Sequence, residues 1–383
     1  MHRIITAWLL VLILAQGIGA RVLAQDEDEI LKYQPDRDYG HDWALGVLLG
    51  LTPEDGVLIG AGPILYEFGF RRLPYIYRMQ LLGGGTLKTG AFKFVYKADL
   101  PTLLDHVDVR IDAHASELQV RNFYGYGNAS FRDEEKEDNN YYRVNSREYL
   151  IQPGLHYRLH ENVSIGVAAS YKHFDLRQKS GRFINTQNLD SLGNDKSLLG
   201  FGVQAGLDTR NHLLFPTGGV RLTLDAWNYP DPFHQGRPFQ KLSADVRTYA
   251  GGTLLADMVF AARVAGEKLY GSFPFYEAAF LGGGGSLGGY FLQRFAGDAS
   301  VLASADLRIS LFRMKILVPT EVGMHILGDV GRVWVDESSP GGWHSDAGGG
   351  LWFAPLSRDV IISVSAASSV DGLFVYGGLG FAF

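Results

Sequence analysis

The amino-acid sequence predicts an all-β protein, a sixteen-stranded antiparallel transmembrane β-barrel with a glycine-rich extracellular loop folded into its lumen. Three observations support this class. Segments of about ten residues alternate apolar with polar side chains, as strands with one lipid face and one polar face do. An export signal precedes them, and no later run reaches the roughly 18 apolar residues of a transmembrane helix. This combination indicates the bacterial cell outer membrane.

The N-terminus has the pattern of a secretory signal peptide. Arg3 precedes a continuous apolar run over residues 4–15, and Val22, Leu23 and Ala24 resemble a small-residue cleavage site. The run is shorter than the roughly 20 residues that cross a bilayer, so a membrane anchor is not expected. The predicted organisation is a signal peptide at residues 1–24, a short periplasmic lead-in at residues 25–42 and the β-barrel at residues 43–383.

Composition argues against several functions. The net charge is −6 and no block of Lys or Arg occurs, which argues against nucleic acid as a partner. The chain has no Cys, and its 11 His lack metal-ligand spacing, so no metal site is expected. Gly284, Ser286 and Gly288 match a G-x-S-x-G nucleophile motif, but that motif needs a preceding strand and a following helix. We therefore expect no cofactor and no catalytic residue, and a protein that is not an enzyme.

Alternating segments follow one another from Trp43 onward. An even number of strands puts both termini on the same side of the membrane, as bacterial barrels require. The connections then sort into short turns on that side, such as residues 159–162, and long polar loops on the other, such as residues 121–142 and 269–298. The sixteen segments are 43–51, 57–66, 75–84, 91–100, 105–118, 143–158, 163–176, 198–210, 218–228, 239–250, 254–268, 299–312, 321–335, 343–355, 359–367 and 372–383.

The last segment carries two signals. A chain that ends in Phe383 after an alternating strand resembles the export signal that barrel-assembly machinery reads. Small residues occupy the other face, and Gly within a strand destabilises it. We predict a weak seam between the first and last strands, at Gly377, Gly378, Gly380 and Phe383. The apolar face of this segment consists of Leu373, Val375, Leu379, Phe381 and Phe383.

Five motifs occur in the order known from one family of membrane barrels. They are residues 122–128 (NFYGYGN), residues 208–219 with Asp-Thr-Arg and Pro-Thr-Gly-Gly, the glycine-rich residues 282–295, Asp306-Leu307-Arg308, and residues 328–334 (GDVGRVW). Together they resemble the BamA/TamA-type outer-membrane assembly proteins, also called the bacterial surface antigen family. The resemblance covers essentially the whole chain after the predicted signal peptide.

The lumen-loop motif departs from the family at one position. The family has an Arg before Gly-[Phe/Tyr], which reaches inward to acidic residues of the next two strands, and here Gly288 takes its place. The corresponding acidic residues would be Asp306 and Asp329, and a buried carboxylate without a cation is costly. We therefore predict that Arg294 contacts Asp306 or Asp329, with Arg308 as the alternative cation. The loop motif comprises Leu287, Gly288, Gly289, Tyr290, Arg294 and Phe295.

The resemblance implies a role in outer-membrane biogenesis, in which proteins are inserted or translocated, or lipid is moved, at the weak seam. The family's periplasmic polypeptide-transport-associated domains have no counterpart, because only the short lead-in precedes the first strand. The expected partners are outer-membrane lipid and lipopolysaccharide, unfolded outer-membrane protein clients, and a separate periplasmic protein that supplies the missing domains.

Two other functions fit the same sequence. Charged residues at polar strand positions are balanced in sign, which suits a passive porin-like channel as well as a barrel filled with paired charges. The acidic residues 133–138 suit a surface-exposed structural or adhesive protein. The lumen charges are Lys93, Lys97, Arg110, Asp112, Arg221, Asp225, Asp245, Arg247, Asp306 and Arg308.

Overall fold

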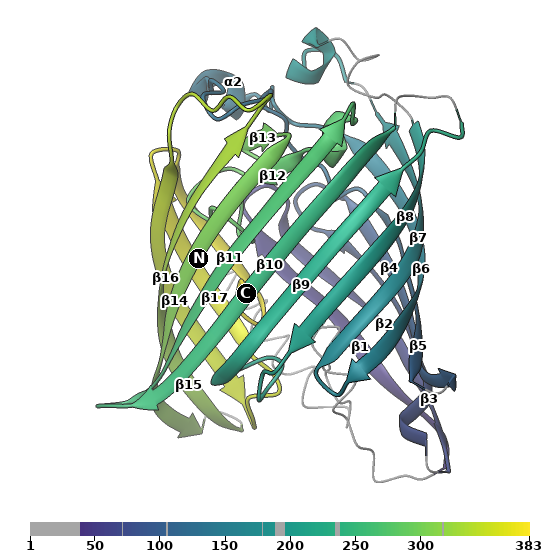
Figure 1. Cartoon of the computed structure of the whole chain (residues 1–383). Coiled ribbons are helices and arrows are strands. Elements are labelled where there is room, and N and C mark those ends of the chain that lie inside the picture. The colour runs from purple at the N-terminus through teal and green to yellow at the C-terminus, as the bar shows by residue number, and fades with distance from the viewer. Residues whose placement is uncertain are drawn as a thin grey trace.

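A computed structural model describes residues 39–383 apart from residues 71, 105, 178, 188–195, 234–237 and 316–317. Sixteen antiparallel strands close into one barrel (Figure 1), which confirms the predicted class. The predicted signal peptide and most of the lead-in lie outside the described residues. Across the described ranges, no helix is long and apolar enough to cross a membrane.

The strand boundaries agree with the predicted segments to within a few residues. Two small strands, β12 (Ala279–Leu281) and β13 (Phe295–Gly297), form a hairpin inside the longest loop. Among the described residues, three short helices lie in the loops, namely α2 (Glu134–Asp138), η2 (Phe183–Thr186) and η3 (Phe275–Glu277). The barrel strands are β1 (Gly40–Thr52), β2 (Gly56–Gly69), β3 (Arg72–Thr86), β4 (Phe92–Leu104), β5 (Val107–Ser116), β6 (Ser146–His160), β7 (Val163–Leu176), β8 (Lys196–Asp208), β9 (Gly218–Tyr229), β10 (Phe239–Thr253), β11 (Asp257–Gly271), β14 (Ala299–Lys315), β15 (Pro319–Trp334), β16 (His344–Pro355), β17 (Ile362–Ser369) and β18 (Gly372–Leu379).

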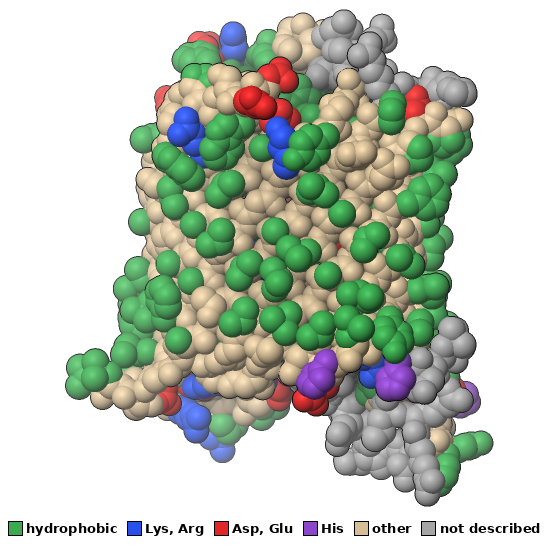
Figure 2. All heavy atoms as spheres, in the orientation of Figure 1, with side chains coloured by type: hydrophobic (Ala, Val, Ile, Leu, Met, Phe, Trp, Pro, Cys, Tyr) green, Lys and Arg blue, Asp and Glu red, His purple; other side chains and the backbone are tan. Residues whose placement is uncertain are grey.

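Each strand presents one face to the membrane and one to the lumen. In β15, Ile326 keeps 52% of its surface exposed, whereas its neighbour His325 keeps 2%. Successive side chains of a strand point to opposite faces, so exposed apolar residues on alternate positions form an outer apolar band. Figure 2 shows these hydrophobic side chains spread over the barrel wall.

The two ends of the barrel differ. The long connections 117–145 and 272–298 lie at one end together with α2 (Figure 1), and short turns such as residues 161–162 lie at the other. β1 starts and β18 ends towards the short-turn end. Because bacterial outer-membrane barrels have short periplasmic turns and long outer loops, we call these ends periplasmic and outer.

The barrel closes weakly between its first and last strands. β1 pairs with β2 over its whole length, but with β18 only at Gly50–Gly378 and Leu51–Gly377 in the described chain. β18 ends at Leu379, so the prediction that this strand continues to Phe383 is wrong. Gly380 has a φ of 80°, a left-handed conformation that favours glycine, and it turns the chain away from β1. Gly377 and Gly378 therefore form the seam, whereas Gly380 and Phe383 do not pair in it.

Candidate functional site

The tip of the glycine-rich loop lies on the lumen faces of the last strands. The hydroxyl of Tyr376 on β18 donates to the Gly288 carbonyl at 2.9 Å, and the Ser369 hydroxyl of β17 donates to the Gly289 carbonyl. A side chain at position 289 would begin 2.6 Å from Cβ of Asp346 and 2.6 Å from the backbone of Ser368. Glycine at this position therefore lets the loop lie directly against the wall.

Backbone amides contact Asp329, one of the two acidic residues that were expected to hold a loop arginine, and its neighbour Asp346. The Gly289 N–H donates to the Asp346 carboxylate at 2.9 Å, and the Gly288 N–H faces Asp329. Asp329 and Asp346 are directly opposite each other on β15 and β16. The predicted contact between Asp329 and the loop is thus present, but it is made by main-chain donors.

Apolar side chains fix the loop above this contact. Leu287 is fully buried, and Tyr290 and Phe295 are buried beside it, against Val333 of β15. Phe295 also stacks on the His344 ring, with the ring centroids 3.8 Å apart. The motif residues therefore share one core that attaches the loop to the inner wall.

Arg294 does not pair with Asp306 or Asp329, so this prediction is wrong. Its Nε donates to the Asp371 carboxylate at 3.0 Å, and its two terminal nitrogens donate to the hydroxyl and carbonyl of Ser130 at 2.8 Å each. The guanidinium also lies over the rings of Tyr124 and Phe295. Arg294 follows the return of the loop towards the outer end, where the β17–β18 turn and loop 117–145 supply its partners.

Asp306 and Arg308 contact the end of the chain instead of the loop. Arg308 is 1% exposed, and its Nε donates to Asp306 at 3.0 Å. Its guanidinium also donates to the Phe383 carbonyl and lies 3.9 Å from the centre of the Phe381 ring. The Nδ1 of His325 donates to the other Asp306 carboxylate oxygen at 3.1 Å. These residues form a lumen network that holds residues 380–383.

Aromatic residues complete the pocket for this tail, which we define as residues 380–383. The Phe381 ring packs against Phe215 in the β8–β9 turn and against Trp352 of β16, with centroids 5.7 and 6.2 Å apart. A cavity of about 250 Å³ remains beside the tail. The aromatic end of the chain thus lies inside the barrel rather than on the lipid face.

The outer mouth is covered by a cap, which we define as residues 53–55, 117–145, 272–298, 335–343 and 370–371. Asp55 in the β1–β2 turn forms ion pairs with Arg121 and Arg143. The Leu292 N–H donates to the Glu54 carboxylate at 3.0 Å, and burial raises the pKa of Glu54 above its ordinary value. These bonds join the first turn of the barrel to two of the long loops.

The NFYGYGN motif forms the centre of this cap. The Asn122 side chain donates to the Leu292 carbonyl at 3.0 Å, and the Asn128 side-chain oxygen accepts from the Val333 N–H at 3.3 Å. Phe123 is buried in an apolar cluster with Phe275 of η3 and Phe174 of β7. The motif therefore links the long loops to one another and to the barrel wall.

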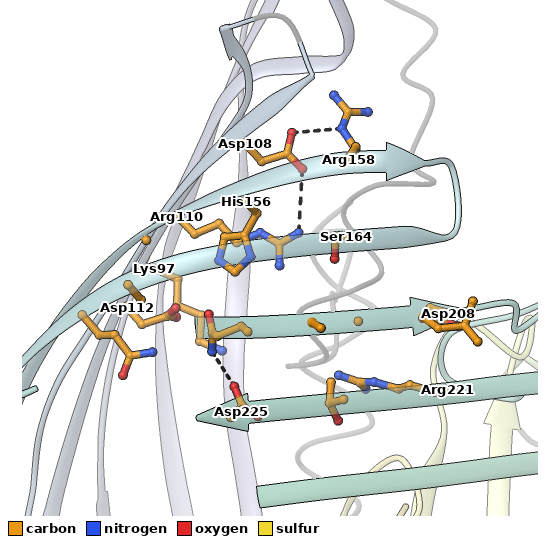
Figure 3. A pocket seen from close by; sticks show the side chains of 18 of the residues that line it. Lys97, Asp108, Arg110, Asp112, His156, Arg158, Ser164, Asp208, Arg221 and Asp225 are labelled. Carbon is orange, nitrogen blue, oxygen red and sulfur yellow. Dashed lines mark hydrogen bonds and ion pairs between the residues drawn. The ribbon is translucent and has the colours of Figure 1, made fainter. Parts of the chain in front are cut away.

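A cavity of about 860 Å³ occupies the lumen beside β4–β9 (Figure 3). It reaches from the periplasmic turn at residues 160–162 to Gln119 of the cap. Asp108 faces Arg110 and Arg158, and Gln204 donates to Asp225 at 2.7 Å. The predicted lumen charges on β4, β5 and β9 line this cavity, and both signs are present. Among the described residues, no group of three acidic or histidine side chains could hold a metal ion.

Several site residues had no signal in the sequence. Asp371, Glu54 and Asp346 lie outside the resembling motifs, and each contacts a loop distant in the chain. Tyr376 lies in the predicted last strand, but alternation reports only that it faces the lumen. The aromatic pocket around Phe381 was missed because the tail was assigned to the strand.

The chain matches the family model described as the Omp85 superfamily domain over residues 79–363. A search of curated proteins finds no match. The fold is similar to BamA from Haemophilus ducreyi lacking POTRA domains 1–3, with a TM-score of 0.62, 15% identity, and coverage of 89% of this chain and 70% of that one.

Two CdiB structures have the same fold. CdiB from Escherichia coli matches with a TM-score of 0.57 and 15% identity, and CdiB from Acinetobacter baumannii with 0.54 and 10%. The matches cover 91% and 90% of this chain, which spans 66% of the length of each CdiB chain. The resemblance to outer-membrane assembly barrels is confirmed. The chain belongs to the Omp85 superfamily and is a β-barrel of the bacterial outer membrane.

Proposed function

We propose that this barrel inserts or translocates proteins at the outer membrane through the seam between β1 and β18. The observation that carries the proposal is the free edge of β1. Ten residues, 40–49, pair with β2 on one side and have no β18 partner on the other. A row of unpaired N–H and C=O groups is a template for another strand.

The tail supports the same function, because it keeps this edge free. If β18 continued in its observed register, Phe381 would lie opposite Val47 and cover the edge. Instead, the Arg308 network holds the tail in the lumen. Separating β18 from β1 then breaks only two residue pairs. If each pair contributes one backbone hydrogen bond of about 1 kcal/mol, the separation costs about 2 kcal/mol.

The client in this proposal is an unfolded outer-membrane protein that arrives from the periplasm. Its strand would add to residues 40–49, and the polar lumen cavity would hold the segments that follow. A separate periplasmic partner that delivers the client remains a prediction. Movement of lipid through the same seam is the alternative, since a lateral opening towards the bilayer would serve either substrate.

The cap argues against a passive channel. A porin-like pore needs an open path at its outer end, but loops 117–145 and 272–298 bond to each other and to the β1–β2 turn across that mouth. A wild-type protein with large, steady conductance in planar bilayers would favour the channel instead. For the adhesive alternative, cell binding that is lost on deletion of residues 133–138 would be the supporting result.

A disulfide across the seam tests the proposal. Gly50 and Gly378 are directly paired, and each has room for a Cβ, with the nearest neighbours 3.8 Å away. The chain has no Cys, so Gly50→Cys with Gly378→Cys gives one possible crosslink. We expect oxidation to abolish insertion of an unfolded barrel protein into proteoliposomes that contain this protein, and reduction to restore it.

A matched pair controls for the oxidation itself. Ala205→Cys with Leu224→Cys joins β8 to β9, two strands on the far wall that pair continuously over residues 201–208 and 221–228. This crosslink should leave insertion unchanged. Full insertion by the oxidised Gly50/Gly378 variant would refute lateral opening at the seam.

A further inference from the structure

Arg332 lies at the outer end of β15 on the face that points to the membrane. Ile326 on the same face is 52% exposed, whereas Val333 on the opposite face is fully buried against the lumen loop. The pairing of β15 with both neighbours is continuous from residue 326 to residue 331, so the alternation of faces is preserved up to this residue. The Arg332 guanidinium therefore lies on the outer surface of the barrel wall.

The local partners of Arg332 leave its charge without a counter-ion. Its Nε donates to the Ser339 hydroxyl at 2.7 Å, and a second nitrogen donates to the Ser339 carbonyl. In the described part of the chain, no carboxylate pairs with it. Two other membrane-facing cations near the outer end differ in this respect, because Arg147 pairs with Glu117 at 2.8 Å and Lys268 pairs with Asp298 at 3.1 Å.

Two tryptophans place Arg332 at the membrane surface. The guanidinium lies 5.5 Å from the Trp334 ring centre and 5.9 Å from that of Trp343. The two rings meet edge to face, and Trp343 is 54% exposed. Tryptophan gathers at the interface between the acyl chains and the headgroups. An arginine cannot lose its charge there, and an uncompensated charge at the edge of lipid is costly, so the site calls for an anion from the membrane.

We propose that Arg332, Trp334 and Trp343 bind a headgroup phosphate of lipopolysaccharide in the outer leaflet. The planar guanidinium is suited to a bidentate contact with phosphate, and the indole rings cover the adjoining apolar surface. Figure 2 shows basic side chains along the outer margin of the wall, above the hydrophobic band.

The test measures lipid retained by the full chain. Protein purified in detergent and freed of lipid is titrated with diphosphoryl lipid A, with dephosphorylated lipid A and with phosphatidylglycerol, and bound lipid is counted by native mass spectrometry. We expect diphosphoryl lipid A to bind best. Arg332→Gln should weaken it about tenfold or more, as expected for the loss of a charge-assisted contact. Arg332→Lys should keep part of the affinity.

Arg147→Gln is the matched control, because Arg147 is also a membrane-facing arginine near the outer end but already has a carboxylate partner. It should leave lipid A binding unchanged. Equal binding to wild type and Arg332→Gln would overturn the proposal. So would equal binding of phosphorylated and dephosphorylated lipid A, a stronger affinity for phosphatidylglycerol, or an equal loss in Arg147→Gln. The result of this test does not depend on the proposed insertion activity, because the assay contains no client protein.

Discussion

The outer cap and the β1–β18 seam belong to the same barrel but are stabilised by different interactions. In the cap, charged side chains with little exposed surface, such as Arg121, Arg294 and Asp55, bond to residues far away in the chain. At the seam, β1 and β18 pair through their backbones at only two positions. Removing one partner of a buried ion pair costs several kcal/mol, whereas each backbone bond contributes about 1 kcal/mol.

This difference indicates where the barrel can open. The cap resists opening along the barrel axis, because several loops must separate together before the mouth clears. Under the proposed function, the seam would open towards the membrane at a small cost, because the tail already lies in the lumen. Four substitutions, ordered from the largest expected effect to the smallest, test whether the two regions are independent.

Arg294→Ala should have the largest effect and should be confined to the cap. It leaves Asp371 without one of its two arginine partners and Ser130 without its donors. We expect the free energy of unfolding of the cap to fall by about 3 kcal/mol. Limited proteolysis within residues 282–294 and thermal unfolding would measure this.

The Gly50/Gly378 crosslink serves as the second readout for Arg294→Ala. Its yield should not change, since the seam shares no bond with Arg294. Arg294→Lys, which keeps the charge, should recover part of the stability. A change in seam crosslinking as large as the loss of cap stability would show that the two regions are coupled.

Phe381→Ala should act on the seam and leave the cap intact. The ring lies between Arg308 and the Phe215–Trp352 pair, and its truncation should weaken docking of the tail by about 2 kcal/mol, since the side chain is half-buried. The released tail can extend along β1, which would bring Leu379 opposite Leu49 in the observed register. Cysteines at those two positions should then crosslink more readily.

Phe381→Leu is the control for the tail experiment, because it keeps an apolar side chain in the pocket. It should give a crosslinking yield near that of the wild type. An unchanged yield in Phe381→Ala would mean that the tail does not control access to the β1 edge.

Tyr376→Phe should produce a smaller effect at the tip of the lumen loop. It removes one hydroxyl that donates to Gly288, and the expected loss is about 1 kcal/mol. Hydrogen exchange of the amides at residues 287–290 should accelerate, while exchange in loop 117–145 should not. Equal acceleration in both loops would show that the tip and the cap open as one unit.

The smallest expected effect is a dependence of the cap on pH. Burial raises the pKa of Glu54, a group in the β1–β2 turn that faces Asp55 and Arg143 and accepts from Leu292. At a pH between the ordinary and the raised pKa, Glu54 keeps its proton in the folded cap but has lost it in the unfolded chain. Stability is therefore fully present below the ordinary carboxyl pKa and falls as pH rises through the raised pKa.

Glu54→Gln should remove most of this dependence. Protection of residues 282–294 from protease, compared at mildly acidic and neutral pH, would measure the change. Glu137, whose pKa is also raised by burial, should account for the remainder. Tighter protection at neutral than at acidic pH in the wild type would contradict the sign of this prediction.

Local sequence pattern predicted the sixteen strands because the membrane imposes it strand by strand. A side chain that faces lipid must be apolar whatever its neighbours are, so alternation is visible without the fold. The resembling motifs likewise located the inward loop. Their partners were not predictable, because Asp371, Glu54 and Asp346 become neighbours of the loop only when the barrel closes.

The sequence by itself determined the barrel, its sixteen strands and the position of the inward loop. Tertiary structure decided which charges pair with that loop and where the chain end lies. Alternation through Phe381 predicted a longer β18. An aromatic side chain, however, is removed from water equally well by lipid and by an apolar pocket. The pocket of Phe215, Trp352 and Arg308 exists only after three distant segments meet. Because that choice depends on contacts rather than on local pattern, the open edge of β1 was visible only in the folded barrel.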